Sequence, residues 1–573
     1  MCGIIGYIGS NAASQILTEG LRRLEYRGYD SVGIAVLGNS GLEVRKDIGM
    51  VDEVSAALQF TSVNGHIGLG HTRWATHGSV CRENSHPHFD SSKKIVAAHN
   101  GVIENFSKLR EDLISKGHKF VSDTDSELIP HLIEENSKDS SLLKAFTKSV
   151  LQIQGSYAIV ALSSSDSEER LFLARKNSPL IIGVGQGEMF CASDISAMLK
   201  HTKTFVPLEE GDIAILTKTG YKVYSSDGAE VQRKQITVDW SESLAQKGGY
   251  PHFMLKEIHD QKHFINESLA TDAGQAKKMI NDYDKIHILG CGTSYHAALI
   301  LAHLLAEKNI QAFIASDYPF VARPDEKTLV IAISQSGETA DILQALRFAE
   351  NSPKIAITNT VESTITRLCD LTVYLNSGPE IGVAATKTFT SQLAVMFKLA
   401  MEKPEGLSSI IEQMIEKENE VKAIAAKLAG SEHAFFLARG INVPIAQEGS
   451  LKFKEITYIH SEAYPGGELK HGTLSLITEG TPVIALAPKD GTATKLLGNI
   501  KEAKARGALV ISLTNDDNIR NESDFSILLP DVDLHLYPFA LIVPLQLLAY
   551  HVSVLRGINP DRPRNLAKSV TVE

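Results

Sequence analysis

The chain has 573 residues and a formal net charge of -11 at pH 7. Hydrophobic residues make up 43% of it and charged residues 22%, which is typical of soluble globular proteins and excludes disordered or fibrous classes. A length of about 150 residues per domain predicts three or four folded units. The charge is acidic and no basic run is interleaved with aromatic residues, so we expect no nucleic-acid partner.

The cysteines are scattered along the chain without a CxxC pair. Their odd number and irregular spacing predict neither a disulfide framework nor a zinc site, so most are expected to be buried thiols. The N-terminus lacks a basic stretch followed by a long apolar one, and we expect no charge-free apolar run of membrane-spanning length. We therefore expect a cytoplasmic protein that uses no membrane, no metal and no other cofactor.

Residues 1–238 contain short β-rich runs, among them IVAAHNGVI, SYAIVAL and LFLAR, separated by few helical stretches. This pattern predicts an α+β domain with a substantial sheet. The polar segment DWSESLAQKGGY at 239–250 interrupts the pattern, and the amphipathic segment PHFMLKEIHDQ follows it. We expect the main domain boundary there, with a linker and connecting helix over 239–280.

From about residue 281 apolar strands alternate with helices: KIHILG precedes TSYHAALILAHLLAE, and TLVIAIS precedes TADILQALRFAE. This alternation predicts βαβ units around a parallel sheet. The pattern repeats after about 150 residues, since TLVIAISQSGETADIL aligns with TPVIALAPKDGTATKL and KIAITN with LVISLTN. We therefore predict two copies of one α/β domain, over 281–425 and 426–563, and a C-terminal tail over 564–573.

The first copy has the hydroxyl-rich loop SQSGET between a predicted strand and helix, where the second copy has APKDG. Hydroxyl groups and free backbone N–H groups at a helix N-terminus suit a phosphate. Serine and threonine are also good helix caps, and for this loop alone capping is the favoured interpretation. A second hydroxyl-rich turn, CGTS after KIHILG, shifts the balance toward ligand binding in the first copy.

Cys2 becomes N-terminal when Met1 is removed, and it then carries both a thiol and a free α-amine. An α-amine has an unperturbed pKa of about 8, so near neutrality a useful fraction is neutral and can accept the thiol proton. An incidental cysteine in the opening strand is the alternative, and by itself the residue does not exclude it.

Several ordered motifs accompany Cys2: MCGIIGYIG, LRRLEYRGYDSVGIAV, HTRWATHG, HNGVIENF and TDSE. Together they resemble the class II glutamine amidotransferase domain, an α+β N-terminal nucleophile fold of sandwiched antiparallel sheets. The resemblance implies that Cys2 attacks the carboxamide of glutamine and that Asn100 and Gly101 form the oxyanion hole. An asparagine side chain and a backbone N–H can converge on a developing oxyanion, each worth roughly 3 kcal/mol.

The same resemblance implies a glutamine pocket. Arg73 binds the α-carboxylate and Asp125 the α-ammonium, because a guanidinium matches a carboxylate and an aspartate complements a cation. Thr76 and His77 line the pocket, and Trp74 corresponds to a gate on the ammonia path.

Two further groups in this region stay open. A metal cluster is one interpretation of four histidines, but their spacing fits no standard ligand signature, so we expect no metal there. Residues of the YRGYDS motif are either pocket wall or ordinary connecting residues. The two groups are His71, His77, His86 and His88, and Arg27, Tyr29 and Asp30.

The C-terminal half resembles paired sugar isomerase (SIS) domains of α/β parallel-sheet fold, and the whole chain resembles the glutamine–fructose-6-phosphate aminotransferase family. This resemblance implies transfer of the glutamine amide nitrogen to fructose 6-phosphate, with ketose-to-aldose isomerisation, at the start of amino-sugar biosynthesis. Ala385 stands where relatives often have serine, which leaves one sugar contact open. The implied sugar-phosphate contacts are Ser294, Ser334, Gln335, Ser336 and Thr339, with Val383 and Ala567 as backbone or wall contributors.

The segment PIAQEGSLKFKEITYIH has a helical period that places Glu448, Lys452 and Glu455 on one face. On a solvated helix such a row is a set of surface ion pairs, and composition alone favours that interpretation. The resemblance instead makes Glu455 the base that moves a proton between C1 and C2 of the sugar. Glu448 and Lys452 then form its charged surroundings.

Two residues near the end of the chain also gain roles from the resemblance. His471 corresponds to a histidine that opens the sugar ring in the partner subunit's site, so we expect a homodimer; alone, it would be a turn or core residue. Lys568 corresponds to the lysine that forms a Schiff base with the open-chain sugar, although the tail by itself predicts disorder.

Two alternative functions remain. A glutamine amidotransferase for another acceptor, such as a phosphoribosyl diphosphate or an adenylated acid, would need pyrophosphate and Mg²⁺ motifs that we do not find. A sugar-phosphate sensor would need the phosphate loop but neither a proton shuttle nor a Schiff-base lysine. The joint presence of Glu455, His471 and Lys568 therefore favours an enzyme.

Overall fold

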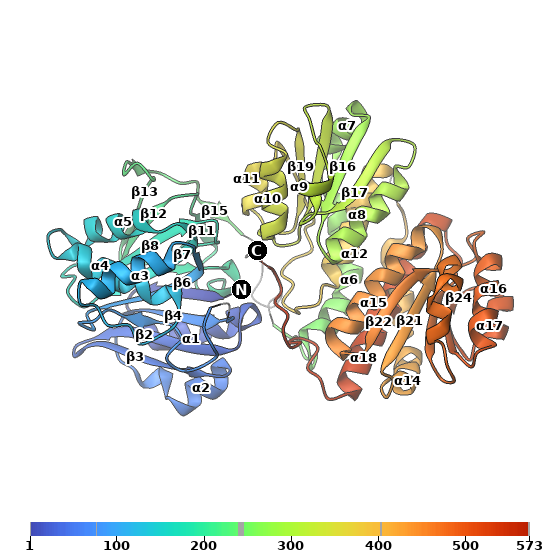
Figure 1. Ribbon diagram of the computed structural model, residues 1–573, viewed down its shortest axis with the longest axis horizontal. Coiled ribbons are helices and arrows are strands. Elements are labelled where there is room, and N and C mark those ends of the chain that lie inside the picture. The colour runs from blue at the N-terminus through green and yellow to red at the C-terminus, as the bar shows by residue number, and fades with distance from the viewer. Residues whose placement is uncertain (1, 76, 239–245, 402–403, 571–573) are drawn as a thin grey trace. The chain divides into compact units, whose positions relative to one another are not determined.

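The computed structural model describes the chain except for residues 1, 76, 239–245, 402–403 and 571–573 (Figure 1). The chain forms two compact units. The N-terminal unit comprises residues 1–245 with 569–573, and the C-terminal unit comprises Gln246–Lys568.

The N-terminal unit contains two antiparallel sheets. The first has the strand order β15-β11-β9-β10-β1-β4-β2-β3 and the second β14-β13-β12-β8-β7-β6-β5. The strands of the first sheet are β1 (Gly3–Ile8), β2 (Ser31–Gly38), β3 (Gly41–Ile48), β4 (Ile67–Arg73), β9 (Ile181–Val184), β10 (Met189–Ala192), β11 (Thr204–Pro207) and β15 (Ile236–Thr237). Those of the second are β5 (His88–Phe89), β6 (Ile95–Ile103), β7 (Gly155–Ser163), β8 (Leu171–Lys176), β12 (Ile213–Thr217), β13 (Gly220–Tyr224) and β14 (Glu230–Val231).

The two sheets pack face to face, and helices cover both outer faces. Along β7, Ala158, Val160 and Leu162 enter the core between the sheets, while Ile159 and Ala161 enter the core under the helices. This period of two is what a strand buried on both faces requires. The helices are α1 (Ala13–Leu24) and α2 (Val51–Ala57) on the first sheet, and α3 (Phe106–Ser115), α4 (Leu128–Ser137) and α5 (Leu142–Gln152) on the second. The predicted sandwich of antiparallel sheets is confirmed.

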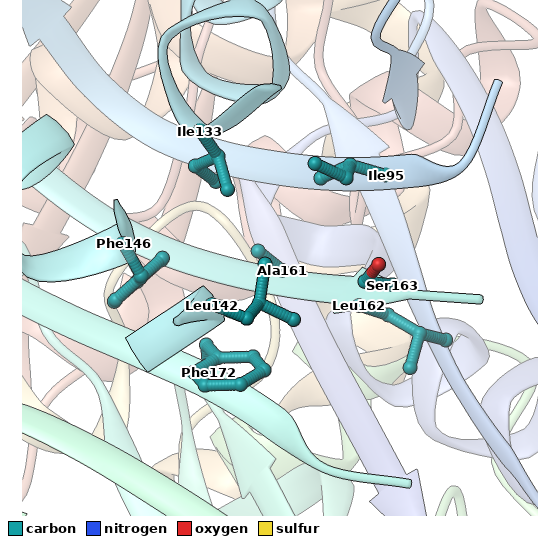
Figure 2. Close-up of a pocket in the computed structure, with 8 residues that line it drawn as sticks. All are labelled: Ile95, Ile133, Leu142, Phe146, Ala161, Leu162, Ser163 and Phe172. Atoms are coloured by element: carbon teal, nitrogen blue, oxygen red, sulfur yellow. The ribbon is translucent and has the colours of Figure 1, made fainter. Parts of the chain in front are cut away.

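The layer between α4, α5 and the second sheet is apolar. Figure 2 shows Ile133 and Phe146 from these helices near Ile95 and Phe172 of the sheet, and all four line the same small gap. The rings of Phe146 and Phe172 lie 5.6 Å apart, and the gap among these side chains has no space for a water molecule. This region is packed core, and it fixes α4 against the sheet.

The C-terminal unit contains two parallel five-stranded sheets with the same spatial order. The orders are β17-β16-β18-β19-β20 and β22-β21-β23-β24-β25. In each copy the second strand of the sequence is therefore an edge strand next to the first. The strands are β16 (Lys285–Gly290), β17 (Asn309–Ile314), β18 (Thr328–Ile333), β19 (Lys354–Thr358) and β20 (Leu371–Tyr374), then β21 (His433–Ala438), β22 (His460–Pro465), β23 (Pro482–Leu486), β24 (Leu509–Thr514) and β25 (Phe525–Leu528). The predicted pair of parallel-sheet α/β domains is confirmed.

One large hydrophobic core joins the two copies. It contains Ile258 of α6, Phe397 of α12, Phe453 of α15 and Leu541 of α18. The helices of this unit are α6 (Phe253–Ala270), α7 (Gly274–Asp282), α8 (Thr293–Leu304), α9 (Tyr318–Val321), α10 (Ala340–Phe348), α11 (Thr364–Leu368), α12 (Lys387–Ala400), α13 (Leu407–Ile415), α14 (Glu418–Leu428), α15 (Val443–Thr457), α16 (Ala493–Lys504), α17 (Asp517–Glu522) and α18 (Tyr537–Leu555).

Two of the predicted domain limits can be compared with the helices of the C-terminal unit. The segment predicted as a linker contains α6, which is part of the shared core, and the limit at 425/426 lies inside α14. The two copies therefore share helices, and their limits remain predictions.

Our expectation that no apolar run reaches membrane-spanning length is wrong for one segment. Leu534–Leu555 has 22 residues with a mean hydropathy of 1.7, and 89% of its apolar window is buried inside the unit. Burial of this kind is that of a core helix, which passes the same test of length and composition. The run belongs to α18, at the centre of the shared core.

Candidate active sites

Cys2 lies directly before β1 with its thiol against the backbone of Trp74. The Trp74 N–H donates to Cys2 Sγ over 3.2 Å, and the thiol faces the Trp74 carbonyl oxygen at 3.4 Å. The Cys2 carbonyl oxygen accepts hydrogen bonds from Asn100 Nδ2 at 3.0 Å and from Arg27 Nε at 3.2 Å. Burial raises the pKa of the Cys2 thiol, and the Trp74 amide and Arg73 offset this only in part. Such a thiol needs a base beside it to become a nucleophile.

The side-chain amide of Asn100, on β6, is held by His71, on β4. His71 Nε2 lies 3.1 Å from Asn100 Oδ1 and 3.1 Å from the His99 carbonyl oxygen. Because both partners are acceptors, Nε2 carries the ring proton. Burial lowers the pKa of His71 to about 3, so the ring is neutral at physiological pH. The bond leaves Nδ2 of Asn100 directed toward Cys2.

Gly101 follows Asn100 in a backbone conformation that excludes other residues. Its φ is +133°, and a Cβ at this position would lie 2.0 Å from the Ser156 carbonyl oxygen of β7. The strand can therefore place the Gly101 N–H beside the Asn100 amide only if no side chain is present.

Arg73, at the end of β4, is 2% exposed and donates to the loop that follows it. Its guanidinium reaches the carbonyl oxygens of His77 at 2.5 Å, Gly78 at 3.1 Å and Ser79 at 3.1 Å. Burial lowers the pKa of Arg73, and the neighbouring Cys2 and other acids act in the opposite sense. The loop brings the His77 backbone to Arg73, while the His77 side chain is exposed.

Asp125 lies in the 3₁₀ helix η3 (Asp125–Glu127), directly before α4. It is 5% exposed, and its Oδ2 accepts the Ile103 N–H at 2.8 Å. This bond ties Asp125 to β6, two residues beyond Gly101. Trp74 is half-buried, with its ring 5.5 Å from that of Tyr29 in an edge-on arrangement. Thr76 lies outside the described residues.

Three of the histidines considered as a metal cluster lie ring to ring, one pair stacked and the next pair edge-on. The rings of His71 and His86 lie 4.0 Å apart, and those of His86 and His88 lie 4.7 Å apart. Burial lowers the pKa of all three rings, so they are neutral. His71 donates to Asn100, the ring of His86 stacks on that of His71, and His88 contacts His86.

The hydroxyl-rich loop between β18 and α10 is bonded within itself. The hydroxyls of Ser334 and Thr339 lie 2.8 Å apart, and the Gly337 N–H donates to Ser334 Oγ over 3.1 Å. Thr339 is the N-cap residue of α10, yet its side chain makes no capping bond. The expected capping function is therefore not what the hydroxyl does here, which leaves the helix N-terminus available for an anion.

Three other predicted contact residues lie in or near this loop of the first copy. Ser294 lies in the first turn of α8 and accepts a hydrogen bond from Gln392 Nε2 at 3.0 Å. Gln335 accepts the Asn359 N–H at 3.1 Å through its backbone, and Ser336 Oγ accepts the Glu338 N–H at 3.2 Å.

The corresponding loop of the second copy contains a carboxylate, Asp490, near the start of α16. Asp490 accepts hydrogen bonds from the Thr492 N–H at 2.9 Å and from Asn442 Nδ2 at 2.6 Å. A carboxylate at this helix N-terminus takes the place that an anionic ligand would need. We therefore keep the first copy as the candidate phosphate site.

Glu448, Lys452 and Glu455 of α15 form a buried cluster. Lys452 Nζ lies 2.7 Å from Glu455 Oε2 and 3.4 Å from Glu448 Oε1, and the first two side chains of the row are at most 1% exposed. Thr293 and His296 of α8 reach Glu448 at 3.0 and 2.7 Å. The alternative of a solvated row of ion pairs is therefore wrong.

The electrostatics of this cluster suit proton transfer. Burial raises the pKa of Glu455, and Lys452 opposes the rise. Burial disfavours the Lys452 charge, but Glu448 and Glu455 outweigh it and raise the pKa of the ammonium. The cluster thus contains a buried ammonium beside a carboxyl group whose pKa lies above its ordinary value.

Lys568 is paired with Glu380, a residue that the sequence did not single out. The two side chains are 5% and 0% exposed, and Lys568 Nζ contacts Glu380 Oε2 directly. Glu380 also accepts the Thr386 N–H at 2.9 Å and the Thr388 hydroxyl at 2.6 Å. Burial disfavours the Glu380 charge, but Lys568 and Thr388 lower its pKa to about 2. The tail around Lys568 is therefore anchored.

Three predicted residues remain: two with little or partial exposure, and one histidine with an exposed side chain. Val383 is 8% exposed, and Ala567 is half-buried beside Lys568. His471 ends the 3₁₀ helix η7 (Gly466–His471), and its side chain is exposed. Among the described residues, no hydrogen bond or ion pair joins His471 to Glu455.

Three groups in these sites could not be singled out from the sequence. His71 appeared only as a possible metal ligand, and its position two residues before Arg73 is the one local hint. Glu380 is joined to a lysine 188 positions away, and His296 to a glutamate 152 positions away. Contacts over such separations follow from the fold.

Comparisons with known proteins agree with this architecture. A glutamine amidotransferase domain model matches residues 71–200, and a SIS domain model matches 279–401 and 427–556. The glutamine–fructose-6-phosphate aminotransferase (isomerizing) of Pyrococcus horikoshii is 47% identical over 599 residues, covering 100% of both chains. The proteins of the same name from Thermococcus kodakarensis and Clostridium tetani are 46% and 43% identical, again over 100% of both chains.

A solved structure resembles the C-terminal unit. The C-terminal domain of glucosamine-fructose-6-phosphate aminotransferase from Francisella tularensis is 32% identical, with a TM-score of 0.52. The match covers 55% of this chain and 100% of that one.

Proposed function

Because this chain belongs to the glutamine–fructose-6-phosphate aminotransferase (isomerizing) family, we propose that it transfers the amide nitrogen of glutamine to fructose 6-phosphate. The products are glucosamine 6-phosphate and glutamate. The observation that carries the sugar half of this proposal is the ion pair of the partly buried Glu455 with the buried Lys452, in the same unit as a hydroxyl loop suited to phosphate. A sensor would need the loop alone.

The first step is attack of the Cys2 thiolate on the glutamine carboxamide carbon. The α-amine of Cys2 takes the thiol proton and passes it to the leaving ammonia, and water then hydrolyses the thioester to glutamate. Asn100 Nδ2 and the Gly101 N–H stabilise the oxyanion, at roughly 3 kcal/mol per donor. Arg73 and Asp125 hold the two charged groups of the substrate's α-carbon, with Thr76 and His77 beside them.

The second step uses the ammonia on the sugar. Lys568 attacks the C2 carbonyl of the open-chain sugar and releases water, forming a Schiff base, and ammonia then displaces the lysine at C2. Glu455 removes a proton from C1 and returns it to C2, which converts the ketose skeleton to the aldose. Ser294, Ser334, Gln335, Ser336 and Thr339 hold the phosphate and sugar, with Val383 and Ala567 as walls.

Two residues connect the steps. Trp74, whose amide contacts the thiol, is our candidate for the gate that releases ammonia. His471 is our candidate for opening the sugar ring in a partner subunit's site, since its side chain is exposed in its own chain. A cytoplasmic homodimer with a glutaminase domain over 1–238 and sugar isomerase domains over 281–425 and 426–563 is therefore part of the proposal.

The test is product identification with amide-¹⁵N glutamine and fructose 6-phosphate. We expect ¹⁵N-labelled glucosamine 6-phosphate and equimolar glutamate, and no labelled product with phosphoribosyl diphosphate as the acceptor. The Cys2→Ala variant is the matched control, and it should lose glutamine hydrolysis while still binding fructose 6-phosphate. Nitrogen transfer to the phosphoribosyl acceptor, or none to the sugar phosphate, would reject the proposal.

A further inference from the structure

Two histidines and a glutamate converge in the N-terminal unit, apart from the residues assigned to glutamine. His131 and Glu134 lie one turn apart on α4, and His118 lies in the segment between α3 and η3. His118 Nδ1 is 3.2 Å from His131 Nδ1 and 3.1 Å from Glu134 Oε2, and His131 Nδ1 is 3.7 Å from the same oxygen. The side chains are 5%, 1% and 19% exposed.

These separations match a tetrahedral zinc site. Zinc binds imidazole nitrogen and carboxylate oxygen at about 2.0–2.2 Å, so two ligand atoms on a tetrahedron lie about 3.3–3.5 Å apart. The three measured distances, from 3.1 to 3.7 Å, span that value. A cation equidistant from the three atoms therefore needs only small side-chain shifts.

Each imidazole also has a carboxylate behind it. His118 Nε2 lies 3.0 Å from Glu135 Oε2, and His131 Nε2 lies 3.7 Å from Glu127 Oε1. Histidines that bind metals usually direct their second ring nitrogen at a carboxylate, which fixes the tautomer. The contact of His118 has this geometry, whereas His131 Nε2 makes no hydrogen bond at 3.7 Å. Glu127 is itself held by the backbone N–H groups of Val121 and Ser122 at 2.8 and 2.7 Å.

This arrangement leaves a problem that a cation solves. A neutral imidazole has one N–H, and with the His118 proton on Nε2 toward Glu135, its Nδ1 is a lone pair that faces Nδ1 of His131. His131 Nδ1 also has the Ser91 hydroxyl at 3.3 Å. Both Nδ1 atoms face Oε2 of Glu134, which accepts the Ser91 N–H at 3.2 Å, while Oε1 accepts the Ser92 N–H at 3.2 Å. Three electron-rich atoms in contact repel each other unless a positive charge lies between them.

We propose that His118, His131 and Glu134 bind one Zn²⁺ ion, with water as the fourth ligand. Two imidazoles and one carboxylate suit zinc, whereas magnesium and calcium prefer oxygen ligands throughout. Within the described residues, this is the group of histidine, cysteine or acidic side chains whose ligand atoms all lie within 4.8 Å of one another. The ion would tie the segment after α3 to α4, directly behind the turn that carries Asp125.

The test is zinc binding to the full-length chain after chelation and dialysis. We expect one Zn²⁺ per chain with a Kd below about 1 µM. Co²⁺ in the same site should give the visible absorption of a four-coordinate nitrogen and oxygen site, without a thiolate charge-transfer band. Zinc should also raise the Tm.

Two variants and two controls keep the test sharp. Glu134→Gln is isosteric and retains an acceptor for Ser91 and Ser92, and His131→Gln removes one imidazole; each should weaken zinc binding at least 100-fold. His66→Gln, at an exposed histidine, and Cys81→Ser, at an accessible thiol, should leave it unchanged. Circular dichroism of the metal-free variants checks their folding. The proposal is overturned if the Glu134→Gln variant binds zinc as tightly as the parent chain. It is also overturned if the parent chain binds no zinc below about 10 µM, because a proton would then hold the cluster together.

Discussion

The Nε2 atom of His71 lies 3.1 Å from Oδ1 of Asn100, and this bond orients the amide that faces Cys2. We predict that His71→Leu lowers kcat for glutamine hydrolysis by about tenfold or more with little change in KM, because the full loss of an oxyanion donor lowers kcat by about 10²–10³. His71→Gln should restore much of the rate, since its amide can donate to Asn100. A steady-state glutaminase assay measures both.

The same ring gives a pH expectation. Because burial lowers the pKa of His71 to about 3, the ring does not titrate between pH 5 and 8. The parent enzyme and the glutamine variant should therefore show the same shape of pH–rate profile in that range. A shift of the acid limb in the variant would mean that His71 changes charge during catalysis.

The hydroxyl-rich loop of the first copy and the corresponding loop of the second copy each contain a glycine with a positive φ. Gly337 and Gly491 have φ values of +66° and +83°, but a Cβ on Gly337 would lie 2.1 Å from Ser363 Oγ, whereas one on Gly491 has nothing within 4 Å. We predict that Gly337→Ala raises the Kd for fructose 6-phosphate by about tenfold or more, while Gly491→Ala, which bears similar backbone strain of about 1 kcal/mol, does not. Calorimetric titration distinguishes them, and equal effects would remove the phosphate from the first loop.

Glu455 sets a pH limit on the sugar step. Burial raises its pKa above the ordinary 4.5, and a base must be ionised, so proton transfer should fall as the pH drops through that raised value. Glu448 contributes to the rise, and Glu448→Gln should move the acid limb to lower pH. Exchange of the C1 proton of fructose 6-phosphate in D₂O, followed by NMR, measures the rate. An unmoved limb in the Glu448 variant would contradict this coupling.

Lys568 should matter for stability as well as chemistry. Lys568→Met leaves the Glu380 charge buried and unpaired, and we predict a loss of about 3 kcal/mol in the free energy of unfolding of the C-terminal unit at pH 7. The pKa of Glu380 is lowered from 4.5 to about 2, so its contribution in the parent is complete above 4.5 and is lost as the pH falls toward 2. The deficit of the variant should therefore shrink on acidification.

Scanning calorimetry at neutral and acidic pH tests this prediction. The matched control is Lys262→Met, which breaks an exposed ion pair with Glu412 and should change stability little. A deficit for Lys568→Met that is the same at pH 7 and at about pH 3, inside the range over which the Glu380 contribution is lost, would show that lost packing, and not the Glu380 charge, is responsible.

The sequence predicts the sheets well because their signals are local. Alternation of apolar strands with helices identified both parallel sheets, and the repeat of TLVIAIS as TPVIALA identified the second copy. One local rule failed: the capping preference of threonine did not hold at Thr339, whose hydroxyl bonds Ser334 instead. The apolar run of α18 was also missed, since hydropathy alone does not distinguish a central core helix from a membrane span.

The sequence predicted those site residues that lie within recognisable motifs. Cys2, Asn100 and Gly101 lie together as the motif order implied, but the contact of His71 with Asn100 depends on the packing of two different sheets, which contain β4 and β6. Glu380 is buried against a lysine that follows it by 188 residues, and no periodicity marks such a pair. Tertiary contacts determine which polar side chains are buried and desolvated, and local sequence patterns do not show this.

The shared core of the C-terminal unit has a consequence for synthesis on the ribosome. Gln261 of α6 donates to Gln546 of α18 over 2.9 Å, across 285 residues of chain. At about 5–20 residues per second, α6 emerges roughly 15–60 s before its partner helix does. The N-terminal unit, built almost entirely from the first 245 residues, has that interval in which to fold. The thiol pocket should thus be assembled while the apolar faces of the C-terminal unit are still uncovered and exposed to chaperones.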